Sequence, residues 1–199
     1  LSHGHEVWWA KIPILKGLLK KIIKDVDYLG YLGDFTKGEI AKTSNQPQKF
    51  LQIAPGIDTN HFAPHSGALK LRSDLEINDK KVIVSVGRLV HRKGQDSLIS
   101  ALPEILRRHP DAHILMVGAG PYKDHLAKMV SDLKVAGSIT FIGRIEHADL
   151  PRYISVGDVF AMPSRSRLAG LEVEGLGIVY LEASACELPV IAGKSGGAP

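Results

Sequence analysis

The sequence contains one cysteine, few aromatic residues and no long apolar run. Cys186 cannot form an internal disulfide, and its place among Ala and Ser in an apolar segment predicts a small core residue. No segment approaches the ~20 apolar residues that a membrane-spanning helix needs, and the first residues lack the pattern of a signal peptide. These absences lead us to expect a cytoplasmic protein.

A strong charge of either sign is also missing. The 199 residues carry a formal net charge of +4, which suits phosphorylated ligands or an anionic membrane surface. No basic strand is rich in aromatic residues, so we expect no nucleic acid partner. The composition, 44% hydrophobic and 23% charged, is that of a globular chain of one or two domains. The start at LSHGHE and the stop at GKSGGAP lead us to expect a chain truncated at both ends.

From residue 80 onward, apolar β-branched segments alternate with amphipathic ones. Strands are predicted at KVIVSVG, AHILMVG, SITFIG, DVFAMP and PVIAG, with helices between them. This alternation predicts a doubly wound parallel α/β sheet, in which ligands bind beyond the carboxyl ends of the strands. The turn-rich PGIDTNHF, residues 55–62, is the predicted interdomain hinge. Before it, residues 27–33 and 50–54 are predicted strands and residues 35–44 a helix.

Residues 11–24, KIPILKGLLKKIIK, form a predicted basic amphipathic helix. Lys16, Lys20 and Lys24 lie on one face, and the apolar face holds Ile12, Leu15, Leu19, Ile22 and Ile23. Two interpretations stay open. The helix could lie on an anionic lipid surface, or it could pack its apolar face on its own domain and leave the lysines in water.

Residues 171–183, LEVEGLGIVYLEA, give the strongest functional signal, two glutamates eight positions apart. Two glycines precede a predicted helix at residues 178–185, whose free N–H groups and positive dipole end favour phosphate. Glu174 stands before the first turn and Glu182 inside the helix, so the two should contact different parts of one extended ligand. The alternative is that both are solvated, the usual state of glutamate.

Arg88 and Lys93, in GRLVHRKGQD, follow the first strand of the alternating series. Two cations at the ligand edge of a sheet can hold a diphosphate, Arg as a planar fork and Lys as a point charge. They would also stabilise a departing nucleoside diphosphate without a metal. The alternative is that both are solvated loop residues.

Glycines and a further cation follow the next two strands. GAGP, residues 118–121, is a loop of the GxG type, but Lys123 breaks the dinucleotide pattern GxGxxG, so no nicotinamide site is expected. A tight strand-to-helix turn is the simpler interpretation of this loop. Arg144 and Ile145 follow FIG at the same predicted edge of the sheet.

Together these motifs resemble the family 4 retaining glycosyltransferases of the GT-B fold. The resemblance rests on the E-x7-E pattern of Glu174 and Glu182, on Arg88 and Lys93, and on PGIDTNHF. SRLAGLEVEGLGIVYLEASA, PVIAGKSGGAP and the initial HGHEV are similar, more closely, to bacterial phosphatidylinositol mannosyltransferases that act on the mono-mannosylated lipid. The resemblance covers nearly the whole chain.

The resemblance implies two Rossmann-like domains and a set of partners. A partial acceptor-side domain with the hinge would occupy residues 1–63, and an incomplete donor-nucleotide-binding domain residues 64–199. The implied reaction transfers a hexose, mannose from GDP-mannose, to a hydroxyl of a lipid-linked or glycan acceptor. A lipid acceptor also implies peripheral contact with the inner face of the cell membrane.

The resemblance implies roles at the diphosphate and at the transferred sugar. Arg88 and Lys93 match the residues that hold the donor diphosphate and assist the leaving group. Glu174 matches the glutamate that contacts the transferred sugar. The backbone from Gly175 to Ile178 would lie near sugar and phosphate.

Further roles follow for the nucleoside and the acceptor side. Glu182 matches the residue that binds the ribose hydroxyls, and Ile145 falls where the backbone of the family pairs with the base. His3 matches a histidine that reaches the donor sugar, with His5 as its nearby competitor. Because these two histidines lack a third ligand nearby, no metal site is expected, and no cofactor is implied beyond the donor substrate.

The implied reaction retains the anomeric configuration through a transition state similar to an oxocarbenium ion. A front-face route, in which the departing phosphate helps to deprotonate the acceptor, is favoured over a covalent intermediate on Glu174. Two alternatives stay open: a nucleotide-sugar epimerase of GT-B fold and a non-catalytic nucleotide-binding module. Because the opening strands, the Gly-rich N-terminal loop and the Glu after GGAP are missing, we expect the chain as given to bind donor weakly and to turn over poorly.

One departure from such relatives lies at the end of the glutamate helix. Relatives commonly have Gly between Cys186 and Leu188, whereas this chain has Glu187. Glycine suits a left-handed helix end, so we expect Glu187 to cost up to about 1 kcal/mol.

Overall fold

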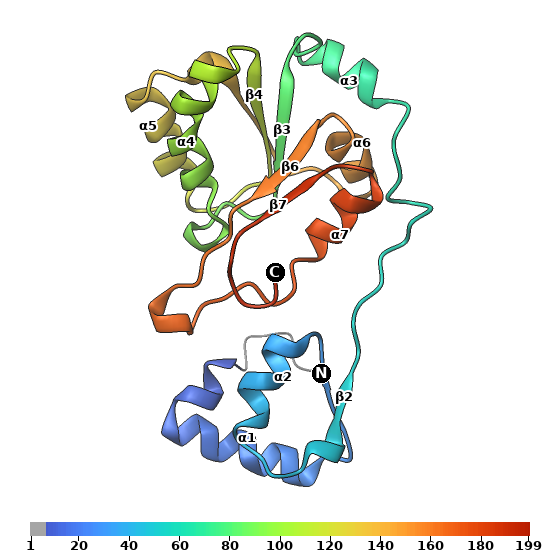
Figure 1. The fold of residues 1–199 in the computed structure, drawn as a ribbon, viewed down its shortest axis with the longest axis vertical. Coiled ribbons are helices and arrows are strands. Elements are labelled where there is room, and N and C mark those ends of the chain that lie inside the picture. The colour runs from blue at the N-terminus through green and yellow to red at the C-terminus, as the bar shows by residue number, and fades with distance from the viewer. Residues whose placement is uncertain (1–6) are drawn as a thin grey trace. The chain divides into compact units, whose positions relative to one another are not determined.

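The computed structural model describes residues 7–199, which divide into two compact units (Figure 1). The first unit contains the chain up to Gly56 together with Ser164–Gly177 and Lys194–Pro199. The second contains Ile57–Pro163 and Ile178–Gly193. The predicted domain boundary at residue 63 stays a prediction. The predicted site residue His3 and its neighbour His5 lie outside the described residues.

The first unit contains a two-stranded parallel sheet, in which β1 (Leu29–Tyr31) pairs with β2 (Phe50–Gln52). Its helices are α1 (Pro13–Asp25) and α2 (Asp34–Ala41). Short 3-10 turns lie at Trp9–Lys11, Pro47–Lys49 and Leu168–Gly170. These elements confirm the strands and helices predicted before the hinge.

Helix α1 buries one side and exposes another. It begins at Pro13, which suits a first helical position, and near its end Lys49 Nζ donates to the carbonyls of Ile23, Lys24 and Val26 at 2.7–3.1 Å. Leu19 and Ile23 pack with Ile40 of α2 in a small core. The interpretation of a helix packed on its own domain is therefore right for this face. A second apolar stripe remains exposed, with Ile14 at 85%, Leu18 at 46% and Ile22 at 37%.

The second unit contains a five-stranded parallel sheet in the order β5-β4-β3-β6-β7. Its strands are β3 (Lys81–Val86), β4 (Ala112–Val117), β5 (Ile139–Gly143), β6 (Val159–Met162) and β7 (Val190–Ala192). The chain moves outward from β3 to β5, then returns to β6 on the other side of β3. This is the doubly wound arrangement that the alternating pattern predicts.

Helices cover both faces of this sheet (Figure 1). On one face lie α4 (Gln95–Arg108) and α5 (Lys123–Asp132), and they enclose the main core with Leu102, Ile114 and Leu126. The other helices are α3 (Ala68–Asp74), α6 (Leu150–Ile154) and α7 (Ile178–Ala185). Short 3-10 turns lie at His91–Lys93, Ala136–Ser138 and His147–Asp149. Of these helices, α3 is the one that the sequence patterns did not predict.

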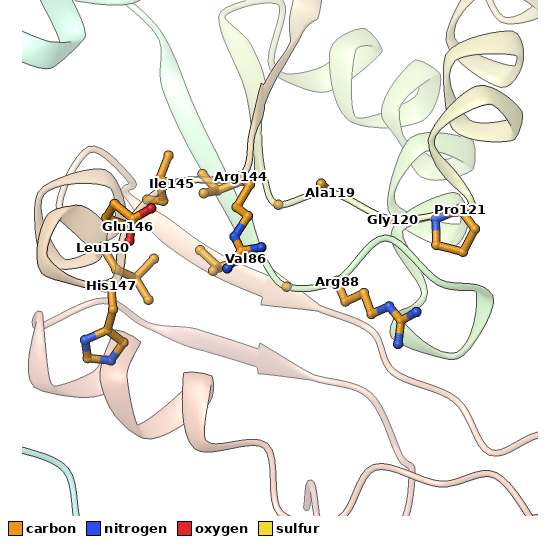
Figure 2. A pocket seen from close by; sticks show the side chains of 13 residues that line it. Val86, Arg88, Ala119, Gly120, Pro121, Arg144, Ile145, Glu146, His147 and Leu150 are labelled. Carbon is orange, nitrogen blue, oxygen red and sulfur yellow. The ribbon is translucent and has the colours of Figure 1, made fainter.

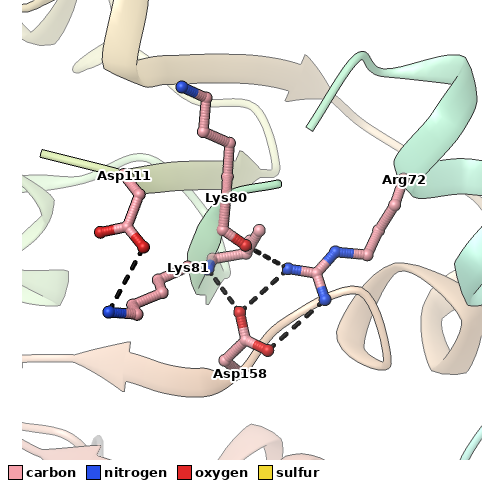
Figure 3. A network of polar contacts seen from close by, with 6 residues as sticks. Arg72, Lys80, Lys81, Asp111 and Asp158 are labelled. Carbon is pink, nitrogen blue, oxygen red and sulfur yellow. Dashed lines mark hydrogen bonds and ion pairs between the residues drawn. The ribbon is translucent and has the colours of Figure 1, made fainter. Parts of the chain in front are cut away.

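At the amino ends of β3 and β6 a polar network ties three segments together (Figure 3). Asp158 Oδ2 accepts the Val82 N–H at 2.6 Å and a guanidinium N–H of Arg72 at 3.0 Å. The same Arg72 nitrogen donates to the Lys80 carbonyl at 2.5 Å. Arg72 comes from α3, so the network fixes this short helix to the strands.

Helix α7 ends as the sequence predicts. Glu187 adopts the left-handed conformation, with φ of 63°. The Leu188 N–H donates to the Ala183 carbonyl at 3.1 Å, which closes a Schellman-type turn. Cys186 is buried beside this turn, as expected of a small core residue. Among the described residues no helix combines the length and apolarity needed to span a membrane.

Candidate functional site

A pocket of about 660 Å³ opens at the carboxyl ends of β3, β4 and β5 (Figure 2). It is lined by residues 86–88, 117–121, 144–147 and 150. Each of the first three segments begins where a strand ends, because parallel strands deliver their following loops to the same edge. The pocket therefore lies where the alternating pattern predicts a ligand.

The two predicted diphosphate-binding cations both belong to the loop after β3. Arg88 is exposed and lines the pocket, and among the described residues its guanidinium has no hydrogen bond or ion pair. Its neighbour Leu89 is fully buried and anchors the loop. Lys93 Cε lies 3.9 Å from the position that a Cβ on Gly87 would occupy. The lysine side chain therefore lies close to the backbone just before Arg88. Arg88 therefore lies at the pocket, and the Lys93 stem lies beside the same loop.

The glycines of GAGP allow the loops after β3 and β4 to touch. A Cβ on Gly118 would lie 2.0 Å from the Gly87 oxygen, and one on Gly120 would lie 2.2 Å from the Leu89 oxygen. The Leu89 N–H donates to the Ala119 carbonyl at 3.0 Å, which extends the pairing of the strands into the loops. The loop is therefore a close-packed strand-to-helix turn, as interpreted, and it also forms a wall of the pocket.

The loop after β5 supplies the opposite wall. Ile145, the predicted base-binding residue, lines the pocket between Arg144 and Glu146. Both flanking side chains are exposed, and within residues 7–199 neither forms a hydrogen bond or an ion pair. Figure 2 shows the Arg144 guanidinium reaching toward Val86 at the end of β3.

Glu182 is half-buried on α7, near a pair of histidines. Burial raises the pKa of its carboxyl, while the charges of His147 and His61 act in the opposite direction. The two imidazoles stack with ring centroids 5.3 Å apart, and His61 Nε2 lies 3.3 Å from the His147 carbonyl. Phe62, which is buried, meets both rings edge-on. Because His147 also lines the pocket, this cluster connects Glu182 to the pocket wall.

Glu174 belongs to the first unit, where a turn of the chain near its end holds its backbone. The Glu174 N–H donates to Ser195 Oγ at 3.1 Å, and its carbonyl accepts the Gly197 N–H at 3.0 Å. A Cβ on Gly196 would lie 2.0 Å from the Glu174 oxygen, so only glycine allows this approach. Both Glu174 and Ser195 are buried.

The structure brings some of the predicted site residues together. Arg88 and Ile145 both line the pocket, and Lys93 lies beside Gly87 at the start of the Arg88 loop. Helix α7 begins at Ile178 as predicted, with Glu182 inside it. Glu174 and Gly175 belong to the other unit, and their convergence on the same ligand stays a prediction. Sequence reasoning missed Glu146, His147 and His61 as parts of the site. No local pattern signals them, because His61 and His147 meet only through the fold.

The described residues contain no group of three or more His, Cys, Asp or Glu side chains arranged to hold a metal ion. The prediction that the site works without a metal stays a prediction.

Residues 69–199 match the family model described as glycosyl transferases group 1. The chain belongs to the group 1 glycosyltransferase family. This match confirms the resemblance that the E-x7-E and Arg/Lys motifs indicate. The matched region begins in α3 and includes the whole pocket.

Two relatives match this glycosyltransferase chain over its entire length. It is 47% identical over 199 residues to the GDP-mannose-dependent alpha-(1-6)-phosphatidylinositol monomannoside mannosyltransferase of Mycolicibacterium smegmatis. It is 42% identical over 201 residues to the GDP-mannose-dependent monoacylated alpha-(1-6)-phosphatidylinositol monomannoside mannosyltransferase of Corynebacterium glutamicum. The chain spans about half the length of these curated relatives, 52% in each case.

Solved structures confirm the fold class. The crystal structure of Anabaena Alr3699/HepE in complex with UDP and glucose superposes with a TM-score of 0.78 at 23% identity, covering 92% of this chain and 50% of that one. At this identity the likeness concerns the fold alone. The fold is that of the GT-B glycosyltransferases, as the motifs predict.

Proposed function

We propose that this chain is the donor-binding part of a retaining mannosyltransferase, which transfers mannose from GDP-mannose to a lipid-linked acceptor such as a phosphatidylinositol mannoside. The observation that supports it most is the 47% identity, over the full chain, to an enzyme named for that donor and that acceptor. The pocket at the carboxyl ends of β3–β5, with Arg88 on its rim, is consistent with a nucleotide donor.

In the proposed reaction the bond between the mannose anomeric carbon and the GDP oxygen breaks as the acceptor oxygen bonds to the same face of that carbon. The acceptor proton moves to a phosphate oxygen of the departing GDP, so charge and atoms balance. Arg88 and Lys93 would hold the diphosphate, whose negative charge grows as it leaves. Glu174 would contact the sugar hydroxyls and Glu182 the ribose, with His3 near the donor sugar.

We also propose that the reaction proceeds without a metal. The positive end of α7 and the two cations would balance the diphosphate charge that Mg²⁺ balances in other transferases. Transfer in excess EDTA should equal transfer in Mg²⁺. A requirement for added Mg²⁺ or Mn²⁺ that Ca²⁺ cannot replace would contradict this.

The transfer itself is tested with the complete gene product that contains this chain. GDP-mannose and vesicles containing mono-mannosylated phosphatidylinositol should yield a di-mannosylated lipid, detected by mass spectrometry, with an α linkage by NMR. UDP-glucose and ADP-glucose serve as competing donors. Transfer from either of these in preference to GDP-mannose would contradict the proposal.

The same assay separates the two alternatives. An epimerase would isomerise the donor sugar when no acceptor is present, which carbohydrate chromatography detects. A non-catalytic nucleotide-binding module would keep its donor binding and its biological function in a Glu174→Ala variant. A mannosyltransferase should lose most of its transfer in that variant.

We propose further that α1 contacts an anionic membrane surface. The exposed stripe of Ile14, Leu18 and Ile22 repeats every four residues, so the three side chains share one side of the helix. Lys21 and Lys24 are exposed next to that stripe. An apolar stripe beside lysines is the pattern of a helix that lies in the lipid headgroup region.

Vesicle co-sedimentation of the complete gene product tests the membrane contact. Binding to vesicles rich in phosphatidylinositol should exceed binding to phosphatidylcholine vesicles, and an Ile14→Ser/Leu18→Ser variant should lose this excess. Leu133→Ser, an exposed leucine of the other unit, is the matched control. If the double variant binds as the wild type does, or unfolds because the stripe is covered in the complete protein, α1 is not the membrane contact.

A further inference from the structure

Gln95, the first residue of α4, is a buried polar side chain to which the proposed reaction gives no role. Its exposed fraction is 1%, and its Nε2 donates to the Arg88 carbonyl at 3.2 Å. Within residues 7–199 its Oε1 is buried and accepts no hydrogen bond. The side chain therefore connects the start of a helix to the backbone of the arginine that lines the pocket (Figure 2).

The bond from Gln95 holds one end of a peptide group whose other end is also held. The peptide between Arg88 and Leu89 contains the Arg88 carbonyl and the Leu89 N–H, which point in opposite directions in a trans peptide. The Leu89 N–H donates to the Ala119 carbonyl at 3.0 Å, while the Arg88 carbonyl accepts from Gln95. Helix α4 and the loop after β4 thus fix the same peptide plane from opposite sides.

The start of α4 is itself fixed within the second unit. A Cβ on Gly94 would lie 2.0 Å from the Pro163 oxygen, and the φ of Gly94 is 77°, so only glycine fits there. On the next turn, Leu98 and Ile99 belong to the main core. Gln95 is therefore held firmly on one side and transmits that position to Arg88.

A buried amide with one partner is a weak stabiliser of the fold. A single neutral hydrogen bond contributes modestly, and the desolvation of a buried acceptor without a partner offsets about as much or more. A methionine of similar length would fill the same space without burying a polar atom of this kind. Stability therefore does not explain a glutamine at this position, whereas the contact with Arg88 gives it a use in the site.

The Arg88 guanidinium is sensitive to its own backbone because it lies at the end of a long side chain. A rotation of about 15° moves a group about 6 Å away by more than about 1 Å, and such a misplacement costs up to about 100-fold in rate. The Arg88 side chain forms no hydrogen bond or ion pair within the described part of the chain. Its direction therefore depends on the peptide that Gln95 holds.

We propose that Gln95 is a positioning residue, which holds the Arg88 backbone so that the guanidinium meets the diphosphate of the donor. Because Gln95 is buried, it acts through Arg88 and does not touch the donor. The inference rests on the proposed function, since it assumes that Arg88 binds the diphosphate.

The variant Gln95→Met in the complete gene product tests the inference. Transfer from GDP-mannose and the calorimetric affinity for GDP should each fall by about tenfold. The melting temperature should equal or exceed that of the wild type, because the buried acceptor disappears together with the donor. Gln52→Met is the matched control, since it removes a glutamine amide that lies 3.5 Å from the Leu32 carbonyl in the first unit. It should leave transfer and GDP affinity within about twofold.

A double-mutant cycle separates positioning of Arg88 from a general structural role. In an Arg88→Ala background, Gln95→Met should change GDP affinity and transfer by less than about twofold, because no guanidinium is left to position. In an Arg108→Ala background the tenfold loss should persist, because Arg108 is an exposed arginine of α4 that pairs with Glu104. A general structural role would give the same loss in every background.

Three results would overturn the inference alone. They are unchanged transfer in Gln95→Met, an equal loss in the Arg88→Ala background, and a loss of transfer accompanied by a lower melting temperature. A protein that gives one of these and still transfers mannose from GDP-mannose keeps the proposed function. An Arg88→Ala protein that binds GDP and transfers mannose as the wild type does would overturn both the inference and the proposed role of Arg88.

Discussion

The five-stranded sheet has charged side chains at both ends of its strands, the amino edge and the carboxyl edge. They are paired within the fold at the amino edge and unpaired at the carboxyl edge. At the amino ends of the strands, Asp158 is bonded to the Val82 N–H and to Arg72, and Lys81 pairs with Asp111 at 3.3 Å (Figure 3). At the carboxyl ends, Arg88, Arg144 and Glu146 have no partner among the described residues. The shape of this second edge is set by glycine backbones in contact, not by side-chain pairs.

The difference indicates how stability and function divide within one sheet. Charges that are satisfied within the fold hold helix α3 and the loop before β6 in place. Charges that are left unsatisfied remain ready for a ligand, and their removal should cost the fold little.

Removal of Arg88 should have the largest effect on transfer. Without its guanidinium the departing diphosphate loses a charge-assisted partner, so Arg88→Ala should slow transfer by about 100-fold or more. The free energy of unfolding should change by less than about 0.5 kcal/mol. Arg108→Ala is the control for both measurements. A strongly destabilised Arg88→Ala protein would show that this edge is also held by side chains.

Gly118 should be indispensable for the fold at the pocket edge. In Gly118→Ala the new Cβ would meet the Gly87 oxygen at 2.0 Å and φ would stay at +137°, so we expect a loss of about 3 kcal/mol in denaturant unfolding. The control is Gly143→Ala, which also has a positive φ but no atom within 4 Å of its Cβ. It should lose only about 1 kcal/mol. Equal losses would mean that the loop contact is unimportant.

At the amino edge, Asp158→Ala should lower stability and spare the chemistry. The Val82 N–H and the Arg72 guanidinium would each lose an acceptor, and since Asp158 is half-exposed we expect a loss of about 1–2 kcal/mol. Transfer per folded molecule should be unchanged. Asp132→Ala, which removes an exposed i,i+4 pair with Lys128, should cost less than about 0.5 kcal/mol. Slower transfer by the folded variant would show that contacts at the amino edge also affect the ligand groups at the carboxyl edge.

Glu182 should show a small effect on stability and a distinct pH dependence. Because burial raises its pKa, the folded state favours the protonated carboxyl. That contribution is full below the ordinary glutamate pKa and is lost as pH rises through the raised value. At pH 7 the free energy of unfolding of Glu182→Gln should therefore exceed that of the wild type by less than about 1 kcal/mol. This difference should vanish as pH falls below the ordinary glutamate pKa. Donor affinity should drop, because the ribose loses its acceptor.

Glu187→Gln, an exposed change just beyond the same helix, is the control for this pH dependence. A Glu182→Gln variant that melts lower than wild type at pH 7 would mean that the carboxylate is stabilised by its surroundings, with the two histidines outweighing burial.

Much of the second unit was predictable from the sequence because its signals are local. Strand–helix alternation places five strands and the helices α4–α7. The glycine that relatives commonly have at position 187 predicts a left-handed helix end, which φ of 63° at Glu187 confirms. Helix α3 escaped prediction because its seven residues lack caps and a clear apolar period, and it is held by the long-range bonds of Arg72. The Arg88 and Lys93 positions also followed from sequence, since a loop after a parallel strand must reach the ligand edge.

The sequence by itself determined the order of elements, the family and the edge at which the ligand groups gather, because hydrogen bonding within a helix or strand depends on neighbours a few residues away. Only the tertiary structure decided which of those groups line the same wall of the pocket. It stacked His61 on His147, 86 residues apart, and placed Ser195 Oγ where it accepts the Glu174 N–H. It also left Arg144 and Glu146 side by side without pairing them. Such contacts depend on how strands align across the sheet and on which glycines let two loops touch, and no local pattern encodes either.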